Sequence, residues 1–438
     1  MAAIITSAGL EITDKDNRAC CGGSPTKTIP FYNVLFATKV GSGSTRVTYV
    51  QPSAPHKLES IVVKIRSKPG DGNVSGPKDF SGPECLLDKK PILRKKLYVI
   101  INPFGGQGRA VAMFDEYCKP IFDSAGAECT IVHSSSNGHA KELGRDTDFT
   151  GYDAIVCVSG DGIPYEVING LKLRKDDAIK RIPVCQLPAG SGNALANSAT
   201  GSHNYSICCL NVLKGKTTEA DLMYITQGDN VTYSFLSQSF GIGADTDLGT
   251  DSWRWMGPAR FIVGMIQRVL LSTRYPCRIA YKLDEPASIS QNGNALSEPE
   301  GSAPRFGTIN DPIPSDWIVE DHPNLSMFYV GDMPRTSNDT ILFPHSRISD
   351  GVLDMIIWDV SIGAVKAFQI MGKVDKGEHV HEHAVRYHKI AAYRLIPETK
   401  SYISVDGESY KCTPLQVEVL PKAWLTITVN GEYVSVDV

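Results

Sequence analysis

Short apolar runs alternate with glycine-rich turns and helix-compatible stretches from residue 97 onward. The apolar runs cover residues 97–101, 130–132, 154–158 and 182–187, and each is followed by a turn or by small polar residues. Continuous apolar runs of this length are typical of strands buried on both faces, as in parallel sheets. Strand, turn and helix occur four times in succession. The pattern therefore predicts an α/β domain with a parallel sheet over residues 91–223.

The alternation stops at about residue 224. Runs rich in valine, isoleucine, threonine and aromatic residues then cover 232–240, 277–283, 325–330, 355–360, 391–396, 401–405 and 424–429. Such residues favour strands, so this half predicts an antiparallel β-sandwich over residues 224–438, interrupted by helices at 257–271 and 362–371. Residues 284–316 contain few large apolar side chains, which predicts a mobile insertion.

Residues 1–90 are rich in glycine, serine, proline and lysine, and they predict a partly disordered lead-in to the α/β domain. Strand pattern appears within it at residues 31–38 and 60–65. Cys20 and Cys21 precede two glycines, where an exposed thiol pair can accept acyl chains. The alternative is that Cys20 and Cys21 are unmodified thiols without a function.

The composition excludes several classes of protein. The chain has 44 Lys plus Arg and 48 Asp plus Glu, so its formal charge is 44 − 48 = −4. It therefore has no basic excess with which to bind a nucleic acid. No apolar run approaches the roughly 18 residues of a membrane span, and the first ten residues lack the basic segment of a secretory signal. The eleven cysteines form no CxxC pair, which favours a reducing, cytoplasmic compartment.

Three glycine-rich turns carry the candidate chemistry. At the carboxyl ends of neighbouring parallel strands, bare backbone N–H groups and helix N-termini favour polyanions such as phosphate. The first turn is not a Walker loop, because GxxxxGK[ST] is absent, and its alternative is a tight strand-to-helix turn. For the third turn the alternative is a purely structural role. Their residues are Asn102, Pro103, Phe104, Gly105, Gly106, Gln107, Gly108 and Arg109 in the first turn, Ser159, Gly160, Asp161 and Gly162 in the second, and Gly190, Ser191, Gly192 and Asn193 in the third.

Asp161 is the sharpest candidate for a catalytic group. It stands between two glycines at a strand end, so a substrate hydroxyl and a phosphate can both reach its carboxylate. An ordinary turn aspartate is the alternative. Glu166 falls in the first turns of the following helix, where it could organise Mg2+, orient a loop or favour the helix N-terminus.

Two further clusters, one of histidines and one of tryptophan and methionine, do not by themselves indicate a function. His379, His381 and His383 would share one face only in an extended segment, and no cysteine or carboxylate pattern accompanies them. Together with His388 they favour a surface loop over a zinc site. Trp253, Trp255 and Met256 could line a lipid tunnel or belong to an ordinary core.

The three turns together resemble the diacylglycerol kinase catalytic superfamily, and in particular its sphingosine (long-chain base) kinase branch. The matching motifs are Asn-Pro-x-Gly-Gly-x-Gly at 102–108, Ser-Gly-Asp-Gly-x-x-x-Glu-Val-x-Asn-Gly at 159–170 and Leu-Pro-Ala-Gly-Ser-Gly-Asn-Ala at 187–194. Further matches lie at 240–247 and 405–408, so the resemblance runs from about residue 97 to the C-terminus. Residues 29–34 resemble the lead-in of fungal and plant members.

The resemblance implies a Rossmann-like nucleotide domain followed by a β-sandwich lipid-binding domain, with the active site in the cleft between them. Asp161 would be the catalytic base, and the first turn would cradle the ATP phosphates with help from Ser134 and the turn at Ser191 and Gly192. Other positions match family residues near the nucleotide or the lipid head group. They are Arg254, Arg260, Asp406, Gly407 and Glu408 for the nucleotide, and Asp245 and Asp247 for the lipid head group.

The implied reaction transfers the γ-phosphoryl group of ATP, bound with Mg2+, to the primary hydroxyl of sphingosine, sphinganine or phytosphingosine, giving the 1-phosphate. A carboxylate at the pocket neck would pair with the cationic amine of such a base, so Asp245 favours the amine substrate over diacylglycerol. A diacylglycerol or ceramide kinase, an NAD kinase and a non-catalytic lipid-binding scaffold remain as alternatives. We expect a cytoplasmic protein that associates peripherally with a membrane surface, and the sequence leaves its oligomeric state open, a homodimer included.

One stretch departs from the family pattern. Members often carry Thr-Pro-His or a similar triplet after Gly-Asp-Gly, whereas Ile163, Pro164 and Tyr165 stand here. Ile163 offers no hydroxyl and Tyr165 replaces an imidazole, although Asp161 and Glu166 stay in register.

Overall fold

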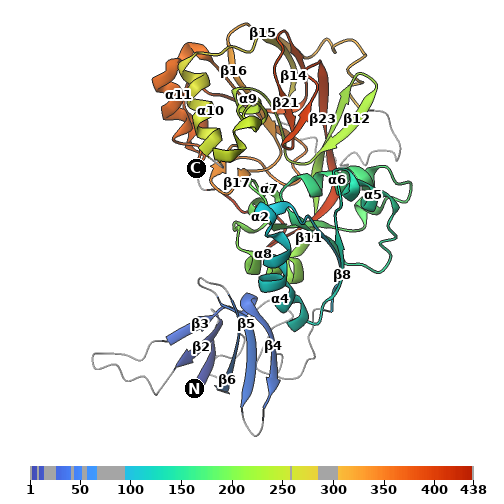
Figure 1. Cartoon of the computed structure of the whole chain (residues 1–438), viewed down its shortest axis with the longest axis vertical. Helices are drawn as coiled ribbons and strands as arrows, with labels where there is room; N and C mark the ends of the chain where they lie inside the picture. The colour runs from blue at the N-terminus through green and yellow to red at the C-terminus, as the bar shows by residue number, and fades with distance from the viewer. Residues whose placement is uncertain are drawn as a thin grey trace, which may run out of the picture.

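The computed structural model describes residues 2–6, 9–13, 26–40, 44–51, 57–66, 94–256, 259–284 and 304–436. In Figure 1 three units follow one another along the long axis of the molecule: an N-terminal sheet, an α/β unit, and a large C-terminal sheet with helices beside it. Cys20, Cys21 and residues 285–303 of the predicted insertion lie outside the described residues.

Six strands form the N-terminal sheet, in the order β3-β2-β1-β6-β5-β4. They are β1 Ala2–Thr6, β2 Gly9–Thr13, β3 Thr26–Ile29, β4 Val34–Lys39, β5 Thr45–Val50 and β6 Leu58–Arg66. The strand patterns at 31–38 and 60–65 correspond to β4 and β6, with residues 31–33 in a 3-10 turn. Strands β1, β2, β3 and β5 lie outside the two predicted strand patterns. Buried Leu10, Val47 and Tyr49 contribute to the core of this unit.

Helix α8, Tyr205–Lys214, holds the N-terminal sheet against the α/β unit. The Lys214 ammonium donates hydrogen bonds to the carbonyl oxygens of Phe31, Tyr32 and Val34. Burial lowers the pKa of Lys214 to about 7. Leu35 and Val50 of the N-terminal sheet also pack into the core beneath α8, so apolar burial and a buried lysine join the two units.

The α/β unit contains the predicted four-stranded parallel sheet, in the order β10-β9-β7-β8. Its strands are β7 Lys96–Ile101, β8 Glu128–His133, β9 Ala154–Ser159 and β10 Val184–Pro188. Alternate residues of β7 point to opposite faces: Tyr98 and Ile100 join one core, and Val99 joins the other. The helices are α2 Gly105–Gly108, α3 Ala110–Met113, α4 Lys119–Ser124, α5 His139–Asp146, α6 Gly162–Lys172, α7 Ala194–Thr200 and α8.

The C-terminal half forms one large sheet, in which β12-β11-β23-β20-β19-β16-β13-β21-β22 follow one another and β14 with β15 branches from β20. All its pairings are antiparallel, as predicted. Its strands are β11 Lys216–Gln227, β12 Asn230–Ser234, β13 Ser237–Gly241, β14 Cys277–Leu283, β15 Ile318–His322, β16 Leu325–Gly331, β19 Leu353–Asp359, β20 Arg386–Pro397, β21 Ile403–Val405, β22 Glu408–Tyr410 and β23 Leu415–Thr428. Strand β11 begins before the boundary expected at residue 224.

The helices predicted in the C-terminal half are α10, Ala259–Leu270, and α11, Gly363–Met371. A further helix, α9 Ile242–Gly249, precedes them, and a two-stranded hairpin of β17 Arg335–Ser337 and β18 Thr340–Ile341 lies beside α7. Figure 1 shows α10 and α11 side by side along one flank of the sheet. Among the described residues, no helix is long and apolar enough to cross a bilayer.

Residues 304–316 lie against the sheet, where the sequence predicted a mobile insertion. The Glu418 carboxylate accepts hydrogen bonds from the backbone N–H groups of Arg305 and Phe306, both at 3.1 Å. Phe306 also packs edge-on against Trp317. Composition does not reveal backbone hydrogen bonds to a distant buried carboxylate. The polar composition of this segment therefore predicted mobility, although Glu418 holds part of it in place.

Candidate active site

The three glycine-rich turns meet at the carboxyl edge of the parallel sheet. A β-carbon on Gly190 would lie 2.2 Å from the Gly160 Cα, and one on Gly105 would lie 2.9 Å from the Ala189 carbonyl oxygen. Both approaches are closer than real β-carbons allow, so a side chain at either position would push the turns apart. The glycines therefore let three backbone segments pack together, as the sequence pattern required.

The first turn continues directly into helix. Gly105–Gly108 form α2, and the Asn102 side-chain oxygen accepts a hydrogen bond from the Phe104 N–H at 3.0 Å. Phe104 is 77% exposed, and Arg109 is also exposed. The side chain of Gln107 is outside the described part of the chain. This turn thus offers a helix N-terminus and an exposed cation near the meeting point of the turns.

Asp161 belongs to the second turn, directly before α6, and its side chain reaches the segment that follows the third turn. Its Oδ1 accepts hydrogen bonds from the Gln186 side chain at 3.1 Å and from the Ala194 N–H at 2.8 Å. Desolvation raises the pKa of Asp161 to about 6, although these donors and the neighbouring amides of Asn193 and Leu195 act in the opposite direction. The carboxylate is therefore ionised at neutral pH and more basic than an ordinary aspartate, which suits a general base.

The third turn is shaped by its own asparagine. Asn193 adopts a left-handed conformation, and its side chain both donates to the Gly190 carbonyl and accepts from the Gly190 N–H, each at 2.8 Å. It is almost fully buried, whereas Ser191 is exposed. In this arrangement Asn193 fixes the turn and leaves Ser191 facing outward. Ser134, at the end of β8, is buried, and its N–H donates to the Ile101 carbonyl at 2.9 Å.

Glu166 caps the neighbouring helix. Its two oxygens accept hydrogen bonds from the N–H groups of Gly138 at 2.9 Å and Ala140 at 3.0 Å, at the start of α5. Of the roles considered from the sequence, this geometry supports orientation of the loop before α5. The helix N-terminus that Glu166 stabilises is that of α5 and not that of its own helix, α6.

Asp406 and Gly407 form the two-residue turn of the β21–β22 hairpin, both with positive φ. The Asp406 carboxylate is buried and accepts hydrogen bonds from the Ser234 hydroxyl and from the N–H groups of Phe235, Leu236 and Ser237. Sequence reasoning placed Asp406 at the nucleotide. In the structure its carboxylate is occupied by the β12–β13 turn, so it holds the hairpin in position.

Glu408, the next residue of the hairpin, faces the α/β unit. A β-carbon on Gly162 would lie 3.1 Å from its Oε1. Burial raises the pKa of Glu408, and the nearby carboxylate of Glu166 raises it further. Tyr165 adds a second contact between the units, because its hydroxyl hydrogen-bonds to those of Tyr410 and Thr232. The residue that replaces the family imidazole therefore joins α6 to the C-terminal sheet.

Asp245 and Asp247 lie on α9, at the C-terminal side of the site. Asp245 contacts the Arg268 guanidinium at 2.9 Å and accepts a hydrogen bond from the Tyr275 hydroxyl at 2.6 Å. Desolvation opposes its ionisation, but these two partners together lower the pKa of Asp245 below its ordinary value. The structure thus places a guanidinium where sequence reasoning expected the amine of a lipid.

Asp247 lies close enough to the Tyr329 hydroxyl to raise its pKa, in addition to the larger effect of burial. Arg260, on α10, donates to the Asp247 carbonyl at 3.3 Å and to the Thr250 hydroxyl at 3.4 Å. Arg254 belongs to a 3-10 turn, Asp251–Met256, and its side chain is not among those described. Trp253 and Met256 are half-buried.

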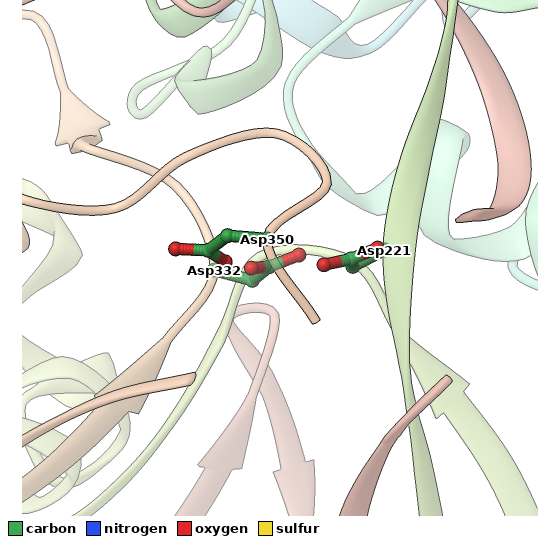
Figure 2. Close-up of side chains that lie close together, drawn as sticks. All are labelled: Asp221, Asp332 and Asp350. Atoms are coloured by element: carbon green, nitrogen blue, oxygen red, sulfur yellow. The ribbon is translucent and has the colours of Figure 1, made fainter. Parts of the chain in front are cut away.

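Sequence reasoning missed a group of three aspartates, Asp221, Asp332 and Asp350, whose carboxylate oxygens lie within 4.8 Å of one another. Figure 2 shows them turned toward one another from β11 and from two loops. Both oxygens of the fully buried Asp332 lack a hydrogen-bond partner among the described residues. Burial, and then the charges of Asp221 and Asp350, raises the pKa of Asp332 well above its ordinary value. The three residues are far apart in sequence, so no spacing could have revealed them.

The histidine segment is partly internal. His379 is buried, and its Nε2 lies 3.1 Å from the Leu342 carbonyl oxygen. Burial lowers the pKa of His379 to about 4. The expectation of a surface loop is therefore wrong for this residue. Among the described residues, the histidines form no group with metal-ligand geometry.

Two known protein families match this chain. The diacylglycerol kinase catalytic domain matches residues 96–225, and the YegS C-terminal NAD kinase beta sandwich-like domain matches residues 326–429. The crystal structure of a diacylglycerol kinase from Bacillus anthracis superimposes with a TM-score of 0.55 at 18% identity, over 76% of this chain and 97% of that one. At that identity the likeness establishes a shared fold.

Curated relatives are more similar in sequence. Sphingoid long chain base kinase 4 of Schizosaccharomyces pombe is 31% identical over 94% of this chain and 90% of its own length. Sphingosine kinase 1 of Arabidopsis thaliana is 33% identical over 73% of this chain and 70% of its length. Sphingoid long chain base kinase 5 of Saccharomyces cerevisiae is 34% identical over 78% of this chain, but the match spans only 60% of that longer protein.

Proposed function

Because the chain belongs to the sphingosine kinase family of lipid kinases, we propose that it transfers the γ-phosphoryl group of Mg-ATP to the primary hydroxyl of a sphingoid base. The observation that carries this proposal is the place of Asp161. Its carboxylate lies where the three glycine-rich turns meet, and burial raises its pKa to about 6. The metal arrives with the nucleotide as part of the substrate.

The reaction needs little covalent work from the protein. The hydroxyl oxygen bonds to the γ-phosphorus while the bond to the β–γ bridging oxygen breaks, and ADP leaves. Asp161 accepts the hydroxyl proton as that bond forms. The N–H groups of the turns, together with Arg109, Arg254 and Arg260, would neutralise the triphosphate.

For the amine of the sphingoid base we propose the carboxylates of α9, Asp245 and Asp247. Asp245 is bound to the Arg268 guanidinium, and Asp247 also has a partner within the chain, so the amine would have to share or displace a partner at either carboxylate. Asp247 lies two residues after Asp245 on α9, close to the Tyr329 hydroxyl. A carboxylate there would stabilise a cationic head group and would gain nothing from diacylglycerol or ceramide.

The lipid must reach the site from a membrane, and we propose that α10 is the contact. Ile262, Ile266 and Leu270 recur every four residues and are 65%, 39% and 63% exposed. Such a stripe on a helix can insert its side chains at the boundary of head groups and acyl chains. With such a contact, we expect a cytosolic protein that binds the membrane surface peripherally.

A panel of lipids tests the proposal. Purified protein with labelled ATP and Mg2+ should phosphorylate sphinganine or phytosphingosine, and should leave diacylglycerol and ceramide unchanged. Product only from the neutral lipids would favour a diacylglycerol or ceramide kinase. Lipid binding without ATP consumption would favour a non-catalytic lipid carrier.

A further inference from the structure

Gln186 is a buried polar side chain of β10, directly beneath the three turns. It is only 4% exposed, although glutamine is usually a surface residue. Its Nε2 donates to Asp161 Oδ1 at 3.1 Å and lies 3.4 Å from the Ser159 carbonyl oxygen, and its Oε1 accepts from the Ala196 N–H at 2.9 Å. One side chain thus links the second turn to helix α7.

The contacts of Gln186 determine which end of its amide faces Asp161. The Ala196 N–H can only donate, so it must meet the amide oxygen. The Ser159 carbonyl can only accept, so it must meet the amide nitrogen. A flip would place two acceptors together and two donors together. The amide N–H group therefore faces Asp161, and the carboxylate receives a fixed donor.

The two oxygens of Asp161 have different surroundings. Oδ1 is held by Gln186 and by the Ala194 N–H. Oδ2 lies beside Gly192, where a β-carbon would approach it to 2.6 Å. The absence of a side chain at Gly192 leaves Oδ2 room next to the exposed third turn. Oδ1 is thus the anchored oxygen and Oδ2 the one that can meet a substrate.

We propose that Gln186 is a positioning residue for the base: its amide holds Asp161 Oδ1, so that Oδ2 is aimed at the lipid hydroxyl. This inference rests on the proposed function, in which Asp161 accepts the hydroxyl proton. The sequence alone could not predict this role, because a glutamine within a strand has the pattern of an ordinary polar residue.

The electrostatic surroundings of Asp161 make this hydrogen bond important. Titratable side chains on the elements packed around it are Arg109 after the first turn, Glu166 on α6, Glu408 on β22, Arg335 on β17, Cys157 on β9 and Cys185 on β10. None of them is a hydrogen-bond partner of Asp161, and the groups that lower its pKa are neutral donors, first Gln186 and then backbone amides. No cation among the described residues replaces the glutamine, so its removal should shift the titration of the base.

The test compares Gln186→Met and Gln186→Glu with the wild-type chain. Methionine keeps the length and removes the donor. Glutamate keeps an acceptor for the Ala196 N–H, and faces Asp161 with a group that donates only when protonated. Gln416→Met is the matched control, because Gln416 is an equally buried glutamine that hydrogen-bonds to Arg394 in the C-terminal sheet. The readouts are the pH profile of kcat/KM for sphinganine, the KM for Mg-ATP and the melting temperature.

We expect the acidic limb, near pH 6 in the wild type, to move up by about one unit in Gln186→Met, since a hydrogen bond to a charged group is worth about tenfold in an equilibrium. It should move further in Gln186→Glu, where two carboxyl groups share a proton. At pH 7 this shift alone lowers kcat/KM about twofold, and the lost orientation of Oδ2 should bring the total fall to at least about tenfold. The KM for Mg-ATP should stay within twofold, and Gln416→Met should keep the wild-type limb. An unmoved limb in both Gln186 variants, with losses only in melting temperature or nucleotide KM, overturns the inference.

The proposed kinase activity and the positioning role of Gln186 can be tested separately. A wild-type chain that phosphorylates none of the lipids overturns the proposed function. Even then, the pKa of Asp161 can be followed by 13C NMR of the carboxyl carbons, assigned with Asp161→Asn. An unchanged Asp161 pKa in Gln186→Met would overturn the role of Gln186 without any measurement of turnover.

Discussion

Arg268 holds both oxygens of Asp245, with its Nη2 donating to Oδ1 at 2.9 Å and its Nε 2.9 Å from Oδ2. The two side chains are only 13% and 18% exposed, so solvent screens the pair weakly. The contact joins α9 to α10, and the Tyr275 hydroxyl adds a third partner. Asp245, one of the two aspartates that the resemblance assigns to the lipid head group, therefore has a structural role.

Asp245→Asn and Asp247→Asn should therefore differ in what they impair. Asp245→Asn leaves the Arg268 guanidinium half-buried without its counter-ion, and we expect the protein to lose about 1–3 kcal/mol of stability. Asp247→Asn should raise the KM for sphinganine roughly tenfold or more, as expected for loss of a shielded charge partner. The reverse pattern, a sphinganine KM raised only by Asp245→Asn, would contradict the assignment.

Gly190→Ala should disrupt the site through backbone crowding. Its β-carbon would lie 2.2 Å from the Gly160 Cα, so the second and third turns must separate. We expect a loss of about 2–3 kcal/mol in stability, typical of overpacking, and a fall in ATP affinity measured by nucleotide titration. Gly228→Ala is the control, because its β-carbon would meet nothing within 4 Å and only the positive φ opposes it. Equal ATP affinity in the two variants would argue against close-packed turns.

Asp332→Asn should change how stability depends on pH. The folded-state pKa of Asp332 is raised, so between the unfolded and folded pKa values the folded state keeps a proton that the unfolded chain releases. Wild-type stability contributed by this group is therefore present at low pH and lost as pH rises. Asp332→Asn removes the charge, and denaturant titration at pH 8 should show it more stable than wild type by about 1–3 kcal/mol. A variant that is less stable at pH 8 would mean that the carboxylate is compensated.

Membrane contact through α10 can be measured with vesicles. Ile262→Asp combined with Leu270→Asp should weaken binding to lipid vesicles at least tenfold, since burying one such side chain is worth about 1.5–3 kcal/mol. Leu173→Asp is the matched control: Leu173 is 55% exposed and follows α6 in the α/β unit. Equal binding by both variants would show that α10 is not the contact.

The sequence predicted the fold and the meeting of the three turns because both follow from local pattern. Buried strands such as 154–158 and glycines such as Gly160 and Gly190 carry their structural reason in their own identity. The roles of Asp245, Asp406 and Glu166 depend instead on partners 23 to 170 residues away, at Arg268, the turn before β13 and the start of α5. A motif match places these carboxylates near the site, but only the structure shows that each already has partners of its own.

The most direct measurement of the central claim is single-turnover phosphorylation of sphinganine by Asp161→Asn. Asparagine keeps the shape and can still accept from the Ala194 N–H, but it cannot accept the hydroxyl proton. We predict a rate at least about 100-fold below wild type, with Mg-ATP affinity within twofold and an unchanged melting temperature. A rate equal to that of the wild type, at full occupancy of both substrates, would contradict the account.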